Sequence, residues 1–256
     1  MKFARFRAGG KIAYGVVHEG VVHEISSTPF LDYEPTGDRH ALDDVRLLAP
    51  SLASKVVAIA LNYRDHAKET GKPLPKEPNF FFKPSTAVIG SGEAISWPPS
   101  CRRLDYEGEL AVVIGSVARR VSAERWREVV LGFTCGIDAT ARDLQRADGQ
   151  WGRAKGFDTS APLGPWIETD LDPSDLALVT RVNGEVRQSS RTSQLVFGVP
   201  ELVEFVTSYV TLLPGDVILT GTPAGIGPLS PGDRVQVEIE GIGTLSVAVR
   251  GGPPAD

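Results

Sequence analysis

The sequence predicts an α+β protein that is rich in β-structure. Short apolar segments separated by Gly and Pro turns, such as the PGD turns at 214 and 231, are typical of strands. Few segments have helical periodicity, and strands and helices do not alternate regularly as they do in a doubly wound sheet. The chain has 256 residues, of which 41% are hydrophobic, so it is long enough to bury a large core.

Residues 1–50 are predicted to form a small N-terminal β-domain that ends in a connecting arm. In residues 2–25 apolar and polar side chains alternate, and the pattern is broken at AGGK and HEG, which indicates an antiparallel meander. Residues 28–50 contain several Pro and Gly and are interpreted as the arm. Residues 51–256 are expected to form the main domain.

Three helices are expected in the main domain. A short helix over 62–70 follows the strand segment VVAIALNY, with Asn62 as its N-cap and Gly71 at its end. A second helix is expected at about 122–131, with Ser122 as its cap. The third is the amphipathic segment VPELVEFVTSYVTL, residues 199–212.

Composition excludes several classes of function. The net charge of -5 gives no support for binding to nucleic acid or to a membrane surface. No apolar run approaches the roughly 20 residues that span a bilayer, and the N-terminus lacks the apolar core of a signal peptide, so a cytoplasmic protein is expected. Cys101 and Cys135 are too few for a disulfide framework or a zinc site, and Cys135 is interpreted as a small buried hydrophobe.

Three carboxylates are candidate metal ligands. In RLDYEGELAVVIG, residues 103–115, Glu107 and Glu109 share one face of a strand, and that face continues through Ala111 and Val113. Two like charges at the edge of a core are costly unless a cation offsets them, although this end of the strand could instead lie in solvent. With Asp138 they form an oxygen-only set, which suits Mg²⁺ or Mn²⁺ rather than Zn²⁺.

Asp138 could also be the first of three polar residues on one face of a helix. If the segment DATARDLQ is helical, then Asp138, Arg142 and Gln145 fall at i, i+4 and i+7 on one face. The alternative is an ordinary ion pair on an exposed helix. The end of a buried strand is a usual place for site residues.

Other candidates are short-range pairs or loop residues. His66 and Glu69 are three apart on the expected helix, so the carboxylate can polarise the imidazole, although both could simply be solvated. Lys155 lies in a Gly- and Pro-rich loop, where it could hold a carboxylate or be an ordinary surface lysine. LTGTPAGIG lacks the Gly-Lys-Ser/Thr of a nucleotide-binding loop, but its Gly amides and the Thr222 hydroxyl could bind a carboxylate. The alternative there is a tight β-turn.

Six segments together resemble the fumarylacetoacetate hydrolase family. They occur in this order over about residues 55–250: NYRDHAKE, FFKPSTAVIG, DYEGELAVVIG, GIDATARDLQ, KGFDTSAPLGPW and VILTGTPAGIG. The resemblance implies a mixed β-sandwich roll after a small N-terminal β-domain, and a homodimer. It places the metal ligands at Glu107, Glu109 and Asp138. It also implies a lid dyad of His66 and Glu69, an active-site Lys155, and substrate contacts from Arg142, Gln145 and Thr222.

The resemblance is to the shorter branch of the family, which includes acylpyruvate hydrolases, oxaloacetate decarboxylases and the isomerase/decarboxylases of aromatic catabolism. It implies a Mg²⁺-dependent C–C bond hydrolase or decarboxylase that acts on a small 2,4-dioxo or 2-oxo acid through a stabilised enolate. One alternative is a 2-hydroxyhepta-2,4-diene-1,7-dioate isomerase or 5-oxopent-3-ene-1,2,5-tricarboxylate decarboxylase. An alternative of another class is a non-catalytic protein that binds a metal and a carboxylate.

Overall fold

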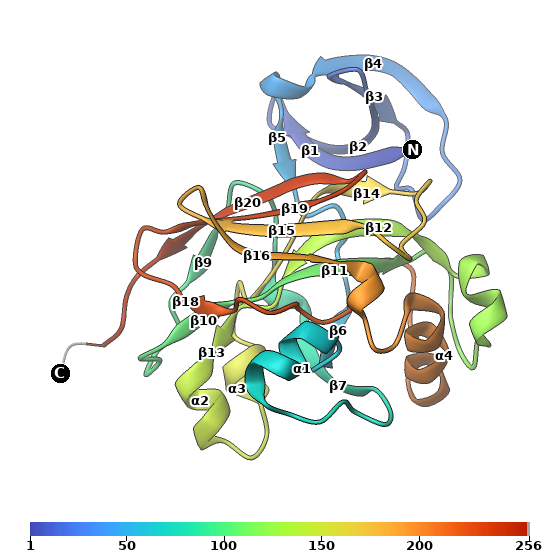
Figure 1. The fold of residues 1–256 in the computed structure, drawn as a ribbon. Coiled ribbons are helices and arrows are strands. Elements are labelled where there is room, and N and C mark those ends of the chain that lie inside the picture. The colour runs from blue at the N-terminus through green and yellow to red at the C-terminus, as the bar shows by residue number, and fades with distance from the viewer. Residues whose placement is uncertain (255–256) are drawn as a thin grey trace.

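One large sheet runs through the whole structure, a computed structural model that describes residues 1–254 (Figure 1). In spatial order its strands are β4 (Pro35–Ala41), β3 (Val21–Ile25), β2 (Lys11–His18), β1 (Lys2–Ala8), β14 (Ala161–Glu168), β12 (Val130–Ile137), β11 (Gly108–Ile114), β17 (Val217–Leu219), β6 (Lys55–Ala60) and β7 (Asn79–Pro84). Two further strands, β5 (Arg46–Leu48) and β8 (Val88–Ile89), pair with β1 and β14.

Two smaller sheets complete the β-structure of the described residues. The five-stranded sheet has the order β16 (Glu185–Arg191), β15 (Ala177–Val182), β19 (Arg234–Ile239), β20 (Gly243–Arg250) and β9 (Ala94–Ser96). The three-stranded sheet consists of β13 (Thr140–Ala141), β10 (Leu104–Tyr106) and β18 (Gly227–Pro228). The five-stranded sheet packs on β11, β12 and β14 of the large sheet. The predicted β-rich α+β class and sandwich architecture are therefore confirmed.

The helices are short and lie mostly at one end of the sandwich. They are α1 (Arg64–Thr70), α2 (Arg142–Ala147), α3 (Gly152–Lys155) and α4 (Val199–Tyr209), with 3₁₀ turns η1 (Leu42–Asp44), η2 (Ser85–Ala87), η3 (Ala123–Glu128) and η4 (Thr192–Gln194). Figure 1 shows α1, α2 and α3 grouped below the large sheet. No helix within residues 1–254 is long and apolar enough to cross a membrane.

Two of the three helix predictions need correction. Asn62 does not cap α1: it is buried, and its amide bonds instead to the backbone of Phe197 and Thr220, so that Tyr63 occupies the N-cap position. The segment expected to be helical at 122–131 is only the 3₁₀ turn η3, since β12 already begins at Val130, and Ser122 makes no capping bond. The amphipathic helix is confirmed as α4.

The N-terminal residues are more ordered than predicted. The meander is present as β1, β2 and β3, drawn in blue at the top of Figure 1. Residues 28–50, interpreted as a connecting arm, also contain two strands that were not expected, because β4 pairs with β3 and β5 pairs with β1. The polar side chains of β4 hid this strand, since nearly all are exposed. A domain boundary at residue 50 stays a prediction, and the last two residues of the predicted main domain lie outside the described residues.

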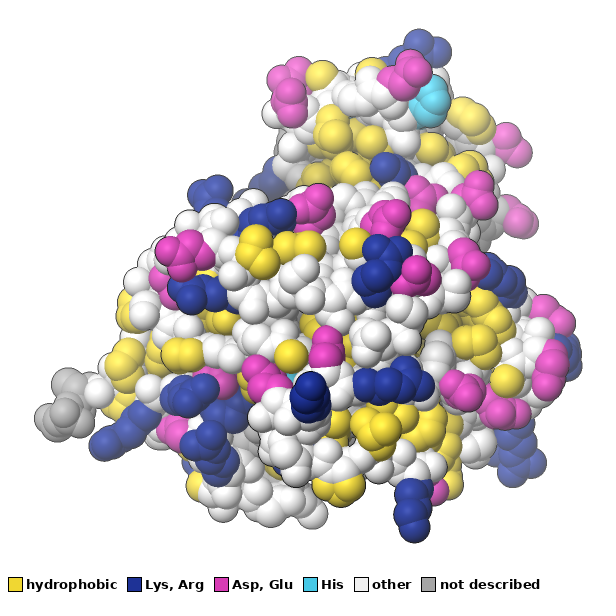
Figure 2. Space-filling view, in the orientation of Figure 1, with side chains coloured by type: hydrophobic (Ala, Val, Ile, Leu, Met, Phe, Trp, Pro, Cys, Tyr) yellow, Lys and Arg dark blue, Asp and Glu magenta, His cyan; other side chains and the backbone are white. Residues whose placement is uncertain are grey.

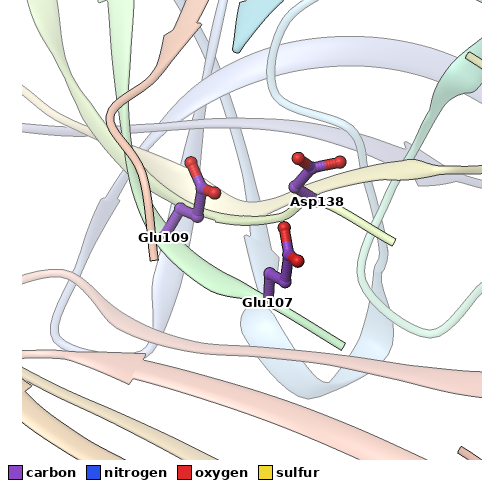
Figure 3. A group of neighbouring side chains, drawn as sticks. All are labelled: Glu107, Glu109 and Asp138. Carbon is purple, nitrogen blue, oxygen red and sulfur yellow. The ribbon is translucent and has the colours of Figure 1, made fainter. Parts of the chain in front are cut away.

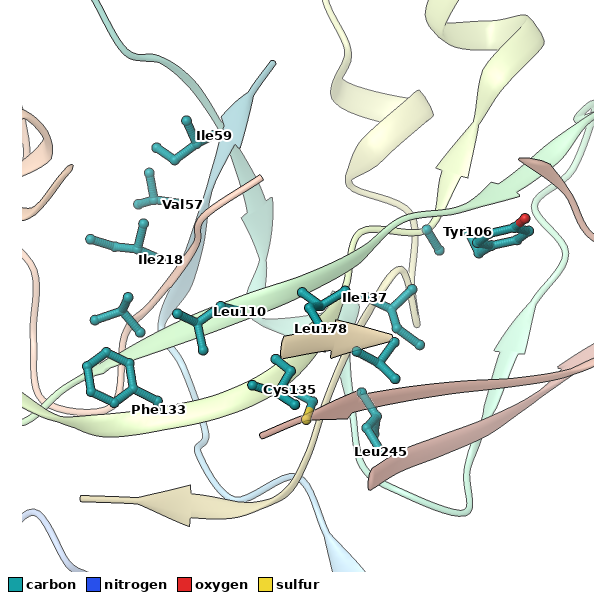
Figure 4. Packing of buried hydrophobic residues seen from close by; sticks show 14 of the residues in the cluster. Val57, Ile59, Tyr106, Leu110, Phe133, Cys135, Ile137, Leu178, Ile218 and Leu245 are labelled. Carbon is teal, nitrogen blue, oxygen red and sulfur yellow. The ribbon is translucent and has the colours of Figure 1, made fainter. Parts of the chain in front are cut away.

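Strand β11 separates two parts of the core. Leu110, Val112 and Ile114 point into the larger hydrophobic cluster, between the large and the five-stranded sheets (Figure 4). Ala111 and Val113 point into a second cluster on the opposite face. The alternation is that of a strand buried on both sides, and the second face is the one on which Glu109 lies.

Both cysteines belong to the interior. Cys135 packs in the larger cluster (Figure 4), and burial raises the pKa of its thiol to about 12. Burial, followed by the nearby Asp143 carboxylate, raises the pKa of Cys101 to about 12 as well. Neither thiol is therefore ionised near neutral pH, which agrees with the prediction that Cys135 is a buried hydrophobe.

A buried carboxylate fixes the start of β17, the strand that leads to the functional residues after Leu219. Asp216 is fully buried and accepts bonds from Ser54 N (3.0 Å), Ser54 Oγ (2.7 Å), Lys55 N (3.1 Å) and Leu213 N (2.8 Å), and it forms an ion pair with Lys55 Nζ. Burial alone would raise the pKa of Asp216, but these donors outweigh it and lower the pKa. The carboxylate thus ties β17 to the start of β6.

We expect Asp216→Asn to lower the free energy of unfolding by about 2 kcal/mol near neutral pH, because a charged acceptor of several bonds is lost. Since the folded-state pKa of Asp216 is lowered, this stabilisation exists above the ordinary Asp pKa and disappears as the pH falls through the lowered value. Urea unfolding at several pH values measures the deficit. A loss no larger than that of Asp32→Asn, a change at an exposed residue, would contradict the assignment.

Candidate functional site

Three carboxylates lie close together where β11 begins and β12 ends. Glu109 lies in β11, Glu107 lies just before that strand, and Asp138 follows β12 directly. Antiparallel pairing sets Glu109 opposite Gly136, and Asp138 N donates to Glu107 O at 2.9 Å, so the two segments hold the side chains together. Ligand atoms of all three lie within 4.8 Å of one another, and Figure 3 shows the carboxylates pointing toward a common space.

All three carboxylates are buried, which rejects the solvent-facing alternative for Glu107 and Glu109. Glu107 has two cationic partners: Lys155 Nζ lies 2.7 Å from its Oε2, and the Arg142 guanidinium donates to its Oε1. Lys155 Nζ also lies 2.5 Å from Asp138 Oδ2. Arg142 and Lys155 therefore pair with Glu107 and Asp138.

The charged neighbours of Glu107, Glu109 and Lys155 determine the direction in which burial and charge shift each pKa. Burial would raise the pKa of Glu107, but Lys155 and Arg142 outweigh it and hold that pKa at about 2. Burial would lower the pKa of Lys155, but Asp138 and Glu107 outweigh it and raise it. Glu109 is different: burial first, then the charges of Asp138 and Glu107, raise its pKa well above the usual range.

Glu109 has no ion pair with any residue in 1–254. Its Oε2 accepts a bond from Gly221 N at 2.7 Å. Gly221 has φ +102°, and a Cβ atom there would lie 2.8 Å from Asn62 Cβ, so a glycine is required for this amide to approach the carboxylate. One neutral donor cannot compensate the charge of a buried carboxylate beside two others.

A divalent cation fits this arrangement. The donors are oxygens only, as Mg²⁺ and Mn²⁺ prefer, and Glu109 forms no ion pair among the described residues. Asp138 Oδ1 is buried without a well-oriented hydrogen bond, although Lys83 Nζ is 2.7 Å away. Glu107, Glu109 and Asp138 could therefore hold a metal ion, as the sequence predicted.

Lys83 is a residue of the site that sequence reasoning missed. It is fully buried, and its ammonium bonds to Ser160 O (3.0 Å), Ser160 Oγ (3.1 Å) and the Lys155 carbonyl. Burial lowers the pKa of Lys83 more than the charge of Asp138 raises it. Sequence pattern gave little signal for it, because Lys83 is the only buried residue of β7, whose phenylalanines are half-buried or exposed.

Asp105 was also missed. It is fully buried between Arg103 and Arg142, whose Nε atoms lie 2.8 and 2.9 Å from its carboxylate oxygens. Asp105, Glu107 and Glu109 alternate along one stretch of sequence, so the same period-2 argument could have included it. Through Arg142, Asp105 helps to fix the orientation of Glu107.

The predicted helix face that carries Asp138, Arg142 and Gln145 is only partly present. Helix α2 begins at Arg142, because residues 140 and 141 form β13, so Asp138 is not on the helix. Arg142 Nη1 donates to Gln145 Oε1 at 2.6 Å, within α2. Lys155 is not in an irregular loop as expected but ends the short helix α3, and it is buried.

His66 and Glu69 form the expected pair on α1. His66 Nδ1 and Glu69 Oε2 are 2.9 Å apart, and Glu69 Oε1 accepts a bond from Gly225 N at 2.9 Å. The second carboxylate oxygen thus fixes the pair against the loop that follows β17. The imidazole Nε2 has no partner among the described residues, and His66 lines the cavity above the carboxylates.

Eight of the nine predicted site residues line one cavity of about 480 Å³. The ninth, Glu69, does not line it but contacts His66, which does. Thr222 lines it, but its hydroxyl donates to Gly108 O at 2.9 Å and accepts from Gln188 Nε2 at 2.8 Å. The one hydroxyl proton is therefore already engaged, so Thr222 in this arrangement can accept from a ligand but not donate to a carboxylate. Its contact with substrate stays a prediction.

The sequence and the structure were compared with those of known proteins, and the matches identify the family of this chain. Residues 55–250 match the family model described as Fumarylacetoacetate (FAA) hydrolase C-terminal, and residues 1–50 match Rv2993c-like, N-terminal. A 5-carboxymethyl-2-hydroxymuconate delta-isomerase structure from Mycobacterium smegmatis is 49% identical, with a TM-score of 0.92 over 98% of this chain and 99% of that chain. Oxaloacetate tautomerase FAHD2A, mitochondrial, from Bos taurus is 45% identical over 79% of this chain and 68% of its own length.

A third relative contains a metal. The structure of maleylpyruvate hydrolase from Sphingobium sp. SYK-6 in complex with manganese (II) ion and pyruvate is 31% identical, with a TM-score of 0.82 over 98% of this chain and 100% of that chain. Relatives of this chain are thus enzymes, among them hydrolases, isomerases and tautomerases. With a matching family domain over most of its length, the chain belongs to the fumarylacetoacetate hydrolase family.

Proposed function

We propose that this protein is a Mg²⁺-dependent enzyme, able to use Mn²⁺, that moves a proton next to the ketone of a small 2-oxo acid. The observation that carries the proposal is Glu109, a buried carboxylate that lies beside two further carboxylates and has no ion pair within residues 1–254. A bound divalent cation would supply positive charge for the oxygen of an enolate. The isomerase and tautomerase among the relatives support proton transfer as the reaction.

His66 is the group proposed to carry the proton. Glu69 holds Nδ1, which leaves Nε2 to face the cavity and to take or return a proton at the carbon next to the ketone. The contact between Glu69 and Gly225 keeps the imidazole in place during this transfer.

Gln145 and Lys155 are proposed to orient the acid. The Oε1 of Gln145 accepts from Arg142, so its amide nitrogen remains as a donor for a substrate oxygen. Lys155 is protonated and buried, and it offers positive charge next to Glu107 and Asp138. Arg142 acts mainly on the protein, because it holds Glu107, Asp105 and Gln145 at once.

The second candidate is C–C bond cleavage by hydrolysis or decarboxylation, which the sequence analysis placed first. The relative that supports it is the maleylpyruvate hydrolase with manganese and pyruvate, although its identity to this chain is lower than that of the isomerase and the tautomerase. In that reaction His66 would take a proton from water rather than from carbon. A metal-carboxylate binder without catalysis is the alternative of another class.

The experiment follows hydrogen exchange and product formation by NMR in D₂O with pyruvate, oxaloacetate and acetylpyruvate, each with Mg²⁺ or after chelation. We expect Mg²⁺-dependent exchange at carbon 3 above the uncatalysed rate. His66→Ala should reduce it about 10²- to 10⁴-fold, the usual contribution of a general base, while His18→Ala, a change in an exposed residue of β2, should not.

Each possible outcome of this experiment contradicts the proposal or favours one of its alternatives. Exchange that survives complete chelation would contradict the metal-dependent reaction. Cleavage products formed without prior exchange would favour the C–C bond hydrolase or decarboxylase. Neither exchange nor cleavage with any of the three acids would support a metal-carboxylate binder.

We also propose that the chain forms a homodimer, as the family resemblance led us to expect, and that it acts in the cytoplasm. Light scattering should give twice the mass of one chain, which is 27.4 kDa. The mass of a single chain at micromolar concentration would contradict the dimer.

A further inference from the structure

Helix α1, which carries His66, depends on polar contacts for its position. It has seven residues and no side-chain bond at its N-cap, and Ala67 is the only buried residue within it. The helix lies at the surface, where Figure 2 shows Lys, Arg, Asp and Glu side chains. A helix this short is not stable by itself, and little apolar packing holds this one. Polar contacts with other segments therefore fix the imidazole at the cavity.

Asp65 connects the first turn of α1 to two other segments. Its Oδ2 accepts a bond from Ser190 Oγ on β16 at 2.6 Å. Its Oδ1 accepts a bond from His66 N at 2.7 Å, and Ala224 N, in the loop after β17, donates to the same oxygen at 3.4 Å. One carboxylate thus contacts a strand, a loop and the backbone of His66.

The simplest alternative is that Asp65 only stabilises the start of α1. An acidic residue in the first turn interacts favourably with the helix dipole, and the bond to His66 N satisfies an amide that has no partner within the helix. One carboxylate oxygen is enough for that role, whereas Ser190 engages the second. Both side chains of this second contact are half-buried, where a hydrogen bond to a charged group is stronger than in water.

Strand β16 also supports the loop after β17. Gln188 is buried two residues before Ser190, and its Nε2 donates to Thr222 Oγ1 at 2.8 Å and to Pro223 O at 2.9 Å. The next two residues of this loop are the ones whose amides donate to the carboxylates of α1. The same strand therefore fixes the loop and the helix relative to each other.

We propose that Asp65 is a positioning residue for His66 and that it acts through its contact with Ser190. This inference rests on the proposed function, because it assumes that His66 carries the proton. Asp65 does not line the cavity, so its effect is to hold α1 where the imidazole Nε2 reaches the carbon next to the ketone. Proton transfer requires hydrogen-bond reach, and a misplacement of about 1 Å can lower a rate about 10²-fold.

Ser190→Ala tests the proposal without changing α1 or any residue that lines the cavity. In the NMR exchange assay with Mg²⁺ and pyruvate, oxaloacetate or acetylpyruvate, we expect kcat to fall about tenfold. KM should stay within about twofold, because the residues proposed to bind the acid are unchanged. Ser190→Thr keeps the hydroxyl and should retain most of the rate. Ser189→Ala is the matched control, since it removes the neighbouring hydroxyl from an exposed residue of β16.

A double-mutant cycle separates action through Asp65 from general damage to β16. Asp65→Ala should lower kcat at least as much as Ser190→Ala does, and the double variant should be no worse than Asp65→Ala alone, because the contact is already lost. Hydrogen exchange of the α1 amides, followed by mass spectrometry without substrate, should be faster in both single variants. Ser189→Ala should leave this exchange as it is in the native protein.

Several outcomes would overturn the inference and leave the proposed function intact. They are a kcat of Ser190→Ala within about twofold of the native value, a loss that Ser189→Ala shares, a rise in KM alone, and single losses that multiply in the double variant. If the native protein catalyses no Mg²⁺-dependent exchange, the proposed function fails. The α1 amides then still report on the contact: faster exchange in Ser190→Ala supports it, and unchanged exchange overturns it.

Discussion

The uncompensated charge of Glu109 is the constraint on which the site depends. Ion pairs with Lys155, Arg142, Arg103 and Lys83 compensate the other three carboxylates that line the cavity, whereas within residues 1–254 the only hydrogen bond to the Glu109 carboxylate comes from the Gly221 amide. A buried carboxylate in this position must take up a proton or a cation, and its raised pKa reflects the first option. Binding of a divalent cation would replace that proton and use the oxygen donors already present.

The fold supplies this site with rigid supports. Glu109 lies on β11, whose two neighbours β12 and β17 are also buried, and Asp138 follows β12. Short helices at the edge of the sandwich carry other residues of the cavity: α1 contributes His66 and α2 contributes Gln145. Asp216 anchors β17, so the loop that carries Gly221 has a fixed origin. The large sheet thus positions the carboxylates, and helices and loops carry the residues proposed to contact a ligand.

Much of the fold and of the site could be predicted from the sequence. Period-2 alternation correctly brought Glu107 and Glu109 together, although Glu107 precedes β11, and the amphipathic pattern correctly identified α4. Pattern reasoning failed where long-range contacts decide: β4 is polar and is a strand only because β3 pairs with it, and the Asn62 amide bonds to distant backbone rather than capping α1. It also missed Lys83 and Asp105, because a buried charge is recognised only when its partners from other segments are known.

Titration of Mg²⁺ into the native protein and into Glu109→Gln, with calorimetry in two buffers of different ionisation enthalpy, tests the central claim most directly. The account predicts that the native protein binds the ion with release of a proton, and that its affinity falls as the pH is lowered, because protonated Glu109 cannot be a ligand. Glu109→Gln should weaken binding more than about tenfold and abolish the proton release. Unchanged affinity in the variant would contradict the account.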